Sequence, residues 1–275
     1  MGTLFVVATP IGNMEDLSPR ALRVLREVDL IAAEDTRPTG AMLRRLGITT
    51  TLLSNHGFNE RARVGRFLEA LERADVALVS DAGTPAVSDP GAILVRAAVE
   101  AGYRVAPIPG PSAVLAAVSA SGLVDGPFTF LGFLPRPSGE RNQMLEDSLA
   151  TGFPLVLFET GPRIARLAEL LAERAPDRAV AVFRELTKLH EESIHAPAHD
   201  LPDRLAEATL KGEFVLVVGA GTTSIEGNPD EAIRAMLARG ERPSDIARVL
   251  AKQFERPRSE LYERVLELQL DSSNA

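Results

Sequence analysis

Residues 80–91 carry the side chains best suited to chemistry with a small polar ligand. A run of four apolar residues at 76–79 is followed by Ser80, Asp81, Gly83 and Thr84, and Asp89 comes shortly after. This pattern predicts a buried parallel strand that opens into a loop at its carboxyl end. Ligands of open α/β sheets bind at that edge. Carboxylates and hydroxyls can hydrogen-bond a polar ligand, and glycine lets the backbone come close to it. The same residues also fit a plainer role, in which Ser88 or Asp89 caps the next helix.

Two further loops have the same character. Residues 9–13 read Thr-Pro-Ile-Gly-Asn and include Pro10, and residues 109–113 read Pro-Gly-Pro-Ser-Ala and include Ser112 and Ala113. Each follows a short apolar run. None has the spacing of a dinucleotide fingerprint or a P-loop, so phosphate binding is only weakly indicated. Three such strand-to-loop junctions predict a small-molecule cleft built from backbone and a few carboxylates.

Four side chains are candidates for moving a proton. Glu34 and Asp35 follow a predicted strand at 30–33, and Glu185 follows another at 179–183. His56 is the side chain best suited to proton transfer near neutral pH. By spacing alone, Glu34 and Asp35 are better explained as part of a solvated loop with a local ion pair, whereas Glu185 fits equally well as an ordinary salt-bridge partner on a domain surface.

Composition excludes several classes of site and favours others. The 275 residues carry a formal net charge of −8, include no cysteine, and have four histidines that form no dense cluster. A disulfide framework, a thiolate nucleophile and a cysteine metal site are excluded, and we expect no resident metal. The acidic balance argues against broad nucleic-acid or DNA binding. No apolar stretch approaches the roughly 20 residues that cross a bilayer, and no signal peptide is evident, so we expect a cytoplasmic protein.

The order of elements predicts three parts. Up to residue 121, short apolar runs alternate with amphipathic stretches, which predicts a mainly parallel sheet covered on both faces. Apolar runs at 128–133, 154–158, 179–183 and 214–218, with helices at about 162–174 and 200–209, predict a second, mixed α/β layer. Short helices follow at about 230–239, 244–254 and 258–268, with Ser244 and Ser259 as expected N-caps. We expect domains at 1–124 and 125–226 and a helical module at 227–275.

The loops together form a pattern that resembles the tetrapyrrole methylase superfamily. The motifs are Thr-Pro-Ile-Gly-Asn (9–13), Ala-Glu-Asp-Thr-Arg (33–37), Ser-Asp-Ala-Gly-Thr-Pro (80–85) with Asp-Pro-Gly (89–91), Pro-Gly-Pro-Ser-Ala (109–113), Gly-Phe-Leu-Pro (132–135), Arg-Glu-Leu-Thr-Lys (184–188) and Gly-Glu-Phe (212–214). The match covers about residues 3–270. Within the superfamily, the chain most resembles the members that methylate ribosomal RNA.

This resemblance implies two α/β domains with S-adenosylmethionine in the cleft between them and a small helical tail. The implied activity is methylation of the ribose 2′-hydroxyl of a cytidine in the decoding region of 16S rRNA, free or in the 30S subunit, by a homodimer. The implied cofactor contacts are Pro10, Ser80, Asp81, Gly83, Thr84, Asp89, Ser112 and Ala113. Candidate RNA contacts are Arg37, Asn59, Arg136, Arg141, Lys188, Arg256 and Arg258.

Two positions depart from the family pattern. The family tends to have a second histidine where this chain has Phe58, and a histidine where this chain has Pro38. An essential role for that second imidazole is therefore excluded here. Two other functions stay open: a methylase of a tetrapyrrole or other small molecule, and a non-catalytic metabolite-binding regulator whose tail resembles a helix-turn-helix. The lack of a strongly basic recognition helix counts against the regulator.

Overall fold

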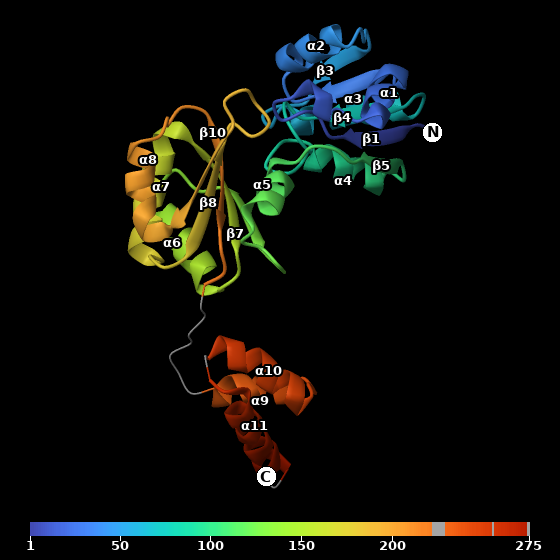
Figure 1. Ribbon diagram of the computed structural model, residues 1–275. Helices are drawn as coiled ribbons and strands as arrows, with labels where there is room; N and C mark the ends of the chain where they lie inside the picture. Colours follow the sequence, from blue (N-terminus) through green and yellow to red (C-terminus); the bar gives the residue numbers. More distant parts are fainter. Residues whose placement is uncertain (222–228, 255, 274–275) are drawn as a thin grey trace.

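The computed structural model describes residues 1–221, 229–254 and 256–273. It contains two five-stranded sheets, each accompanied by helices, and three helices near the C-terminus (Figure 1). The predicted fold class, two α/β layers followed by a small helical module, is confirmed.

The first sheet is entirely parallel and has the strand order β3-β2-β4-β1-β5. Because every strand runs in the same direction, the loops that follow the strands gather at one edge. Its strands are β1 (Thr3–Val7), β2 (Leu30–Ala33), β3 (Thr51–Ser54), β4 (Val76–Val79) and β5 (Arg104–Ile108).

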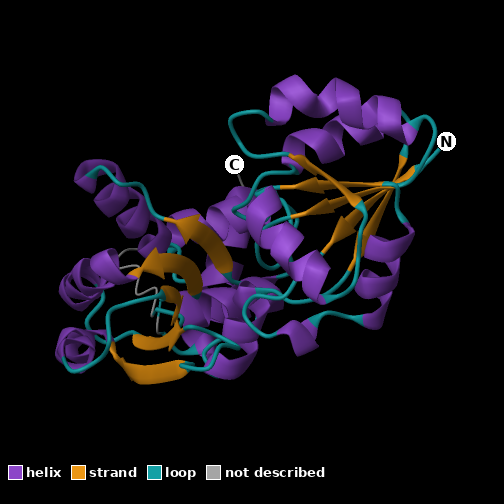
Figure 2. Cartoon of the chain, turned by 90° about the horizontal axis from the view of Figure 1, so that it is seen from above, coloured by secondary structure: helices purple, strands orange, loops and turns teal. Residues whose placement is uncertain are grey.

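Helices cover both faces of this sheet (Figure 2). In β4, the side chains of Ala77 and Val79 pack with α1 (Pro19–Glu27) and α2 (Thr36–Arg45), while those of Val76 and Leu78 pack with α3 (Glu60–Leu71) and α4 (Ala92–Glu100). Alternate residues of a strand face opposite sides, so a strand buried on both sides must be apolar throughout. This explains the unbroken apolar run at 76–79.

The second sheet is mixed, with the order β6-β7-β10-β8-β9. Only β6 and β7 run parallel; the other neighbours are antiparallel. Its strands are β6 (Thr129–Phe133), β7 (Leu155–Thr160), β8 (Ala179–Arg184), β9 (Glu192–Pro197) and β10 (Glu213–Val218). Helices α6 (Ser138–Ala150), α7 (Gly161–Arg174) and α8 (Leu201–Ala206) pack on one face and bury a core that includes Leu145, Leu167 and Leu216.

Helix α5 (Ala113–Ser121) covers the other face of the second sheet, although it follows β5 of the first. Its Val114 and Ala117 are buried with Val156, Ala181 and Val217 of the second sheet. Figure 1 shows the helix between the two sheets. The predicted boundary at residues 124–125 falls just after this helix, so the helix belongs to one part by sequence order and to the other by packing.

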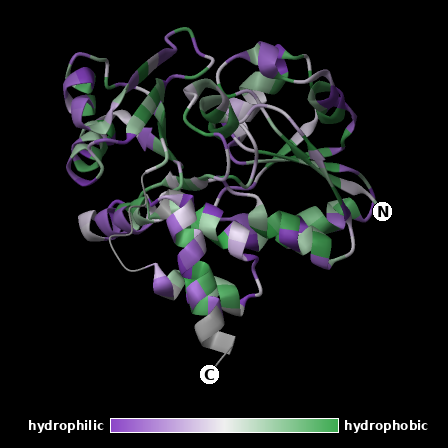
Figure 3. Ribbon diagram, turned by 60° about the horizontal axis from the view of Figure 1, so that its bottom comes forward, coloured by the Kyte–Doolittle hydropathy of each residue, from purple (hydrophilic) through white to green (hydrophobic). Residues whose placement is uncertain are grey.

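Helices α9 (Asp230–Ala238), α10 (Pro243–Gln253) and α11 (Arg258–Ser273) pack on one another around Ile233, Ile246, Leu250, Leu261 and Val265. Apolar and polar residues alternate along these helices in Figure 3, as expected for helices with one buried face. No helix among the described residues is both long and apolar enough to span a membrane.

Several predicted helix ends are wrong. α10 begins at Pro243 with Arg242 at the N-cap, and α11 begins at Arg258, so neither Ser244 nor Ser259 is a cap. Helix α6 was not predicted, because the Pro-rich segment before it is typical of a loop. α2 begins at Thr36, where the Asp35 side chain caps it by accepting the N–H of Arg37. Short 3₁₀ turns lie at Met14–Asp16 and Ala198–Asp200.

The cap of α4 is also not the predicted one. Neither Ser88 nor Asp89 occupies it: the N-cap is Gly91, which has no side chain. Ser112, by contrast, does cap α5, and its hydroxyl accepts the N–H of Leu115 at 3.4 Å. Asp89 therefore does not cap α4.

Candidate functional site

The structure brings three loops of the first sheet together at its carboxyl edge. The N–H of Thr9 donates to the carbonyl of Gly83 at 2.9 Å, and the N–H of Gly83 donates back to Thr9 at 3.0 Å. The Thr84 hydroxyl donates to the carbonyl of Pro111 at 3.2 Å. The three loops are thus joined by two backbone hydrogen bonds and by one hydrogen bond from the Thr84 side chain to a backbone carbonyl.

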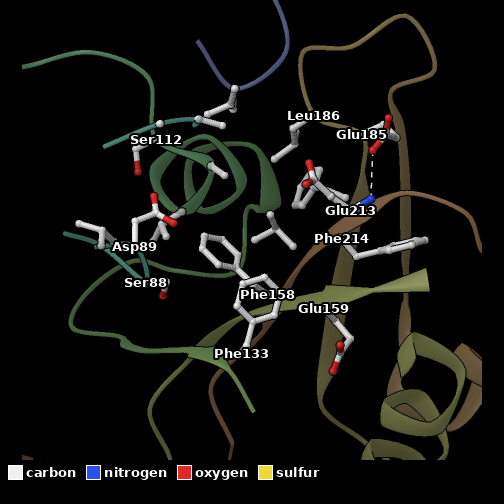
Figure 4. Close-up of a pocket in the computed structure, with 18 of the residues that line it drawn as sticks. Ser88, Asp89, Ser112, Phe133, Phe158, Glu159, Glu185, Leu186, Glu213 and Phe214 are labelled. Carbon is white, nitrogen blue, oxygen red and sulfur yellow. Dashed lines mark hydrogen bonds between the residues drawn. The ribbon is translucent and has the colours of Figure 1, made fainter. Parts of the chain in front are cut away.

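These loops form one wall of a pocket, and the second sheet forms the other (Figure 4). Figure 4 shows Ser88, Asp89 and Ser112 on one side, Glu185, Glu213 and Phe214 on the other, and Phe133 and Phe158 between them. The full lining is Ile11, Ala82, Gly83, Thr84, Val87, Ser88, Asp89, Ser112, Ala113, Val114, Phe133, Phe158, Glu159, Thr160, Phe183, Glu185, Leu186, Lys188, Glu213, Phe214 and Val215. An apolar lining with a few polar groups is typical of small-molecule sites.

Asp89 is the most perturbed carboxyl group of the pocket. Burial raises the pKa of Asp89 to about 6, and the nearby negative charges of Glu34 and Asp81 add to the effect. A hydrogen bond with the Ser80 side chain opposes this shift but does not cancel it. A carboxylate that is costly to ionise is well placed to gain from a bound cation.

Beside Asp89 lies a group of three more acids. The N–H of Asp35 donates to the Asp81 carboxylate at 3.1 Å, and the N–H of Asp81 donates to the Glu34 carboxylate at 3.2 Å. Burial, and then the charges of Asp81 and Asp35, raise the pKa of Glu34, although the hydrogen bond from Asp81 lowers it. The pKa of Asp35 is lowered to about 2, because Arg37 hydrogen-bonds to it. Adjacent acids in one loop therefore differ in basicity.

Across the pocket, an ion-pair network fixes the loop at 184–188. Lys188 Nζ contacts Glu185 Oε1 at 2.9 Å and Glu213 Oε2 at 2.8 Å, and the N–H of Glu213 donates to Glu185 at 3.0 Å. Hydrogen bonding from Lys188 and from the Glu213 backbone lowers the pKa of Glu185. Burial disfavours the charge on Lys188, but the hydrogen bonds to both glutamates outweigh it and raise the pKa of Lys188.

Backbone strain is concentrated on the two sides of this pocket. Within residues 1–221, 229–254 and 256–273, the non-glycine residues with positive φ are Ala86 (66°), Ser88 (63°), Glu185 (52°) and Thr187 (65°). Two belong to the loop at 80–91 and two to the loop at 184–188. Side chains other than glycine rarely adopt this conformation, and such residues cluster at functional sites because the surrounding structure holds them there.

The structure gathers some of the expected site residues in the pocket and leaves others outside. Gly83, Thr84, Asp89, Ser112, Ala113, Glu185 and Lys188 line it. Glu34, Asp35 and Asp81 lie next to Asp89 without lining the cavity. Pro10 and Ser80 are part of the converging loops but are not lining residues, and Ser80 is buried, with its hydroxyl oxygen 3.3 Å from the carbonyl oxygen of Ala82.

The remaining candidates lie on the surface or in other elements. His56 is exposed, with its ring 6.1 Å from that of the fully exposed Phe58. The Arg37 side chain is 88% exposed while it pairs with Asp35. Of the others, Asn59 precedes α3, Arg136 precedes α6, and Arg141 is part of α6; Arg256 precedes α11, and Arg258 is the first residue of α11.

Sequence reasoning missed the aromatic part of the pocket. Phe133, Phe158, Phe183 and Phe214 come from four strands of the second sheet. The rings of Phe158 and Phe133 lie 5.5 Å apart. In the sequence these residues are indistinguishable from core residues, since a phenylalanine in a strand is ordinarily buried. The described residues also contain no group of three or more histidine, aspartate or glutamate side chains arranged to hold a metal ion.

Comparison with known proteins identifies a family model and several relatives that match this chain. Residues 3–202 match the family model of tetrapyrrole (corrin/porphyrin) methylases. The chain is 41% identical to the ribosomal RNA small subunit methyltransferase I of Synechocystis sp., over 98% of this chain and 100% of that protein. It is 43% identical to the protein of the same name from Pseudomonas aeruginosa, over 98% of each chain.

A solved structure shares the fold at lower identity. The uroporphyrin-III C-methyltransferase of Thermus thermophilus, crystallised with S-adenosylhomocysteine, is 18% identical and superposes with a TM-score of 0.57, over 78% of this chain and 97% of that one. With the family model matched over residues 3–202, and relatives matched over nearly the whole length, the chain belongs to the tetrapyrrole methylase family, alongside the proteins named ribosomal RNA small subunit methyltransferase I.

Proposed function

We propose that this protein transfers a methyl group from S-adenosylmethionine to the ribose 2′-hydroxyl of a cytidine in the decoding region of 16S rRNA. The observation that carries the proposal is the identity of 41–43% to the rRNA methyltransferases, which extends over 98% of this chain and so includes the C-terminal helices. The substrate is the rRNA itself or the 30S subunit that contains it.

The pocket has the chemistry that the cofactor needs. S-adenosylmethionine combines a flat aromatic base with polar edges, a ribose, a sulfonium, and a methionyl end that carries an ammonium and a carboxylate. Phe133, Phe158 and Phe183 provide apolar surface for the base, and Asp89 provides an acceptor for a hydroxyl or a cation. At Gly83 a Cβ would lie 3.3 Å from Ile11, so a larger residue would crowd the wall. Gly83, Thr84, Asp89, Ser112 and Ala113 are the proposed cofactor contacts within the cavity.

Reaction at a ribose hydroxyl requires alignment and removal of a proton. When bound, S-adenosylmethionine supplies an electrophilic methyl group for in-line substitution. Alignment by the surrounding residues can lower the activation free energy by about 7–11 kcal/mol. A proton acceptor contributes roughly 10²–10⁴-fold in rate. The task of the protein is therefore to fix the hydroxyl in line with the methyl group and to take its proton.

Among the carboxylates expected to accept that proton, Glu34 is the strongest candidate. The pKa of Glu34 is raised, mainly by burial, whereas the pKa values of Asp35 and Glu185 are lowered by their cationic neighbours. A carboxylate with a raised pKa is a better base at neutral pH. His56, on the exposed turn before α3, stays a candidate for contact with the substrate.

For RNA contacts we propose positions on the surface around the pocket. Arg37 and Lys188 are nearest to the site: Arg37 pairs with Asp35 of the acid group, and Lys188 lines the cavity. Both would exchange part of their carboxylate contacts for phosphate oxygens. Asn59, Arg136, Arg141, Arg256 and Arg258 are proposed as outer contacts.

We propose in addition that the protein works in the cytoplasm as a homodimer, on the strength of the family resemblance. Light scattering coupled to size-exclusion chromatography tests the second point. A mass near 59 kDa, twice the 29.5 kDa of one chain, is expected, and a mass of one chain would refute it.

The decisive experiment supplies the protein with S-adenosylmethionine labelled in the methyl group. It is offered 30S subunits, free 16S rRNA or small metabolites, and any modified ribose is mapped by its resistance to alkaline cleavage. Label in one cytidine of the decoding region is expected. Absence of label from both RNA substrates would overturn the proposal.

A truncation separates this function from methylation of a small molecule on the same scaffold. Removing residues 228–275 takes away α9–α11 and leaves the pocket residues in place. We expect the truncated chain to bind S-adenosylhomocysteine but to lose transfer to RNA. Full retention of RNA methylation would show that the helices are not needed for the substrate.

A further inference from the structure

Glu60 differs from the other buried acids in the parts of the chain that the structure describes. Its side chain is almost fully buried, as are those of Glu159 and Asp230. Glu159 pairs with Arg163 at 3.2 Å, and Asp230 pairs with Arg264. Glu60 forms no ion pair with a described residue. A buried carboxylate is costly unless other groups compensate its charge, so the contacts of Glu60 must come from elsewhere.

Those contacts are backbone N–H groups at the start of another helix. Glu60 Oε1 accepts the N–H of Gly91 at 2.9 Å, of Ile93 at 3.1 Å and of Leu94 at 3.3 Å. The first N–H groups of a helix lack partners within the helix, and a side-chain oxygen normally caps them from the N-cap residue. In α4 the N-cap is Gly91, so a residue of α3 takes over the function of the missing cap.

No residue at position 91 could provide this cap itself. Gly91 has a φ of 132°, and a Cβ there would lie 2.8 Å from Leu78 Cδ2. The backbone conformation at position 91 therefore favours glycine, and the contact with Leu78 adds to that preference. An acceptor brought in from outside the helix is the remaining way to satisfy these donors.

The capped residues end the loop that forms one wall of the pocket. Ser88 and Asp89 line the cavity, and Ala86 and Ser88 have the strained φ values described above. The N–H of Ala86 donates to the carbonyl of Pro90 at 3.3 Å, directly before Gly91. Strained residues keep their conformation only where the surrounding structure determines it. The anchor at Gly91 therefore acts on the conformation of Asp89.

Glu60 also connects this loop to the turn that carries His56. The N–H of Glu60 donates to the carbonyl of His56 at 2.9 Å, and so does the N–H of Asn59. One residue thus holds both the exposed turn at 56–59 and the end of the pocket loop. We propose that Glu60 is a positioning residue, which sets the conformation of the cofactor-binding loop and fixes it relative to the turn before α3. This inference rests on the proposed function of the pocket.

The test compares two substitutions that separate the length of the residue 60 side chain from its charge. Glu60→Gln keeps an acceptor oxygen at the same distance from the backbone, and Glu60→Asp keeps the charge but withdraws it by one methylene. Glu69→Asp is the matched control, because Glu69 is an exposed residue of the same helix. The readouts are the Kd for S-adenosylhomocysteine by calorimetry and folding by circular dichroism and thermal melting.

We expect Glu60→Asp to weaken S-adenosylhomocysteine binding by about tenfold or more. Glu60→Gln should bind within about threefold of the wild type, and Glu69→Asp should be unchanged. A folded Glu60→Asp protein with wild-type affinity would overturn the proposal, and so would a Glu60→Gln protein that binds as weakly as Glu60→Asp. If Glu60→Asp does not fold, the affinity of Glu60→Gln decides: retention supports the role and loss refutes it.

This outcome is distinguishable from failure of the proposed function. If the wild-type protein binds S-adenosylhomocysteine but labels no RNA, the substrate is wrong and the role of Glu60 can still be measured. A comparison of KM values adds a readout that a purely structural role would not move. Glu60→Asp should raise KM for S-adenosylmethionine more than KM for RNA, because the loop it anchors lines the cofactor pocket.

Discussion

Gly12 lies directly against Lys188. A Cβ on Gly12 would come within 2.4 Å of Lys188 Cγ and 2.8 Å of Thr187 Oγ1. The loop at 9–13 follows β1 of the first sheet, whereas the loop at 184–188 follows β8 of the second sheet. Their contact is one place where the two sheets meet beside the pocket, and it has no room for a side chain at position 12.

Gly12→Ala should therefore separate these loops and weaken the site. We expect a loss of about tenfold in S-adenosylhomocysteine affinity, measured by calorimetry, because small displacements at a binding site are costly. Gly65→Ala is a fitting control, since Gly65 is exposed in α3 with nothing within 4 Å of its Cβ position. It should stabilise the protein by up to about 1 kcal/mol. Equal affinity in Gly12→Ala and wild type would contradict the steric argument.

Asp89 should make cofactor binding dependent on pH. Its carboxyl group has a pKa raised to about 6, so it loses its negative charge as the pH falls through that value. We expect the affinity for S-adenosylhomocysteine to fall by about tenfold between pH 7.5 and pH 5, since a charged acceptor binds a cation or hydroxyl more strongly than a neutral one. Asp89→Asn should bind weakly at both pH values. Parallel pH profiles for the two proteins would exclude Asp89 as the source.

The same group should reduce the stability of the ligand-free protein. The pKa in the folded state lies above the ordinary value of 3.8, so ionised Asp89 costs folding free energy above about pH 6. This cost is relieved as the pH falls from about 6 to about 4. Asp89→Asn should raise the free energy of unfolding at pH 8 by about 1 kcal/mol, allowing for partial solvent exposure. Denaturant unfolding at pH 8 and pH 4 measures the free energy of unfolding of both proteins. If Asp89→Asn differed from the wild type by the same amount at both pH values, the ionisation of Asp89 would not be the cause.

Phe158 is the aromatic residue to test in the pocket. Its ring lies 5.1 Å from that of Phe130 and 5.5 Å from that of Phe133. Phe158→Leu should lose about 0.5–1.5 kcal/mol of binding free energy for S-adenosylhomocysteine, the usual value of an aromatic contact. Phe153→Leu serves as the control, because Phe153 is half-exposed and lies outside the pocket. An equal effect of the two substitutions in calorimetry would show that Phe158 does not contact the ligand.

Lys188→Met should expose the role of the ion-pair network. Without Lys188, the hydrogen bond that most lowers the pKa of Glu185 is lost, and Glu185 and Glu213 repel each other. A lowered pKa stabilises the fold at pH values above the ordinary pKa of 4.5, and that stabilisation disappears as the pH falls through the folded-state pKa. We expect a loss of about 1 kcal/mol at pH 7, since the pair is only partly exposed.

The loss caused by Lys188→Met should be smaller near pH 3. Arg166→Met, which breaks a well-exposed pair with Glu169, should change stability by less than about 0.5 kcal/mol. Denaturant unfolding at both pH values measures these effects. If Lys188→Met were no more damaging than Arg166→Met at neutral pH, the network would have no structural importance.

The first sheet could be predicted from the sequence because its signals are local. The fully apolar run at 76–79 indicates a strand buried on both faces, and Ser18 before Pro19 marks the start of α1, where the Ser18 hydroxyl indeed accepts the N–H of Ala21. The order of strands is not contained in such signals. It is the parallel pairing that brings the loops after β1, β4 and β5 to one edge.

The pocket could be predicted only in part, since half of its wall depends on contacts between distant residues. Asp89 was expected to cap α4, but Glu60, which lies 31 positions before Gly91, accepts those N–H groups instead. The aromatic wall was missed because Phe158 and Phe183 look like core residues until the second sheet is placed opposite the first. Long-range packing, which single-sequence patterns do not encode, decided both cases.

The packing of α5 has a practical consequence for dividing this chain. A fragment ending at residue 124 would carry Val114 and Ala117 on a helix stripped of its partner surface, while a fragment starting at residue 125 would leave Ala181 and Val217 bare. Both pieces would tend to aggregate when expressed alone, because each presents an apolar patch that the other normally shields. A cut near residue 110 would keep the helix with the sheet it protects, at the expense of breaking the ligand cleft.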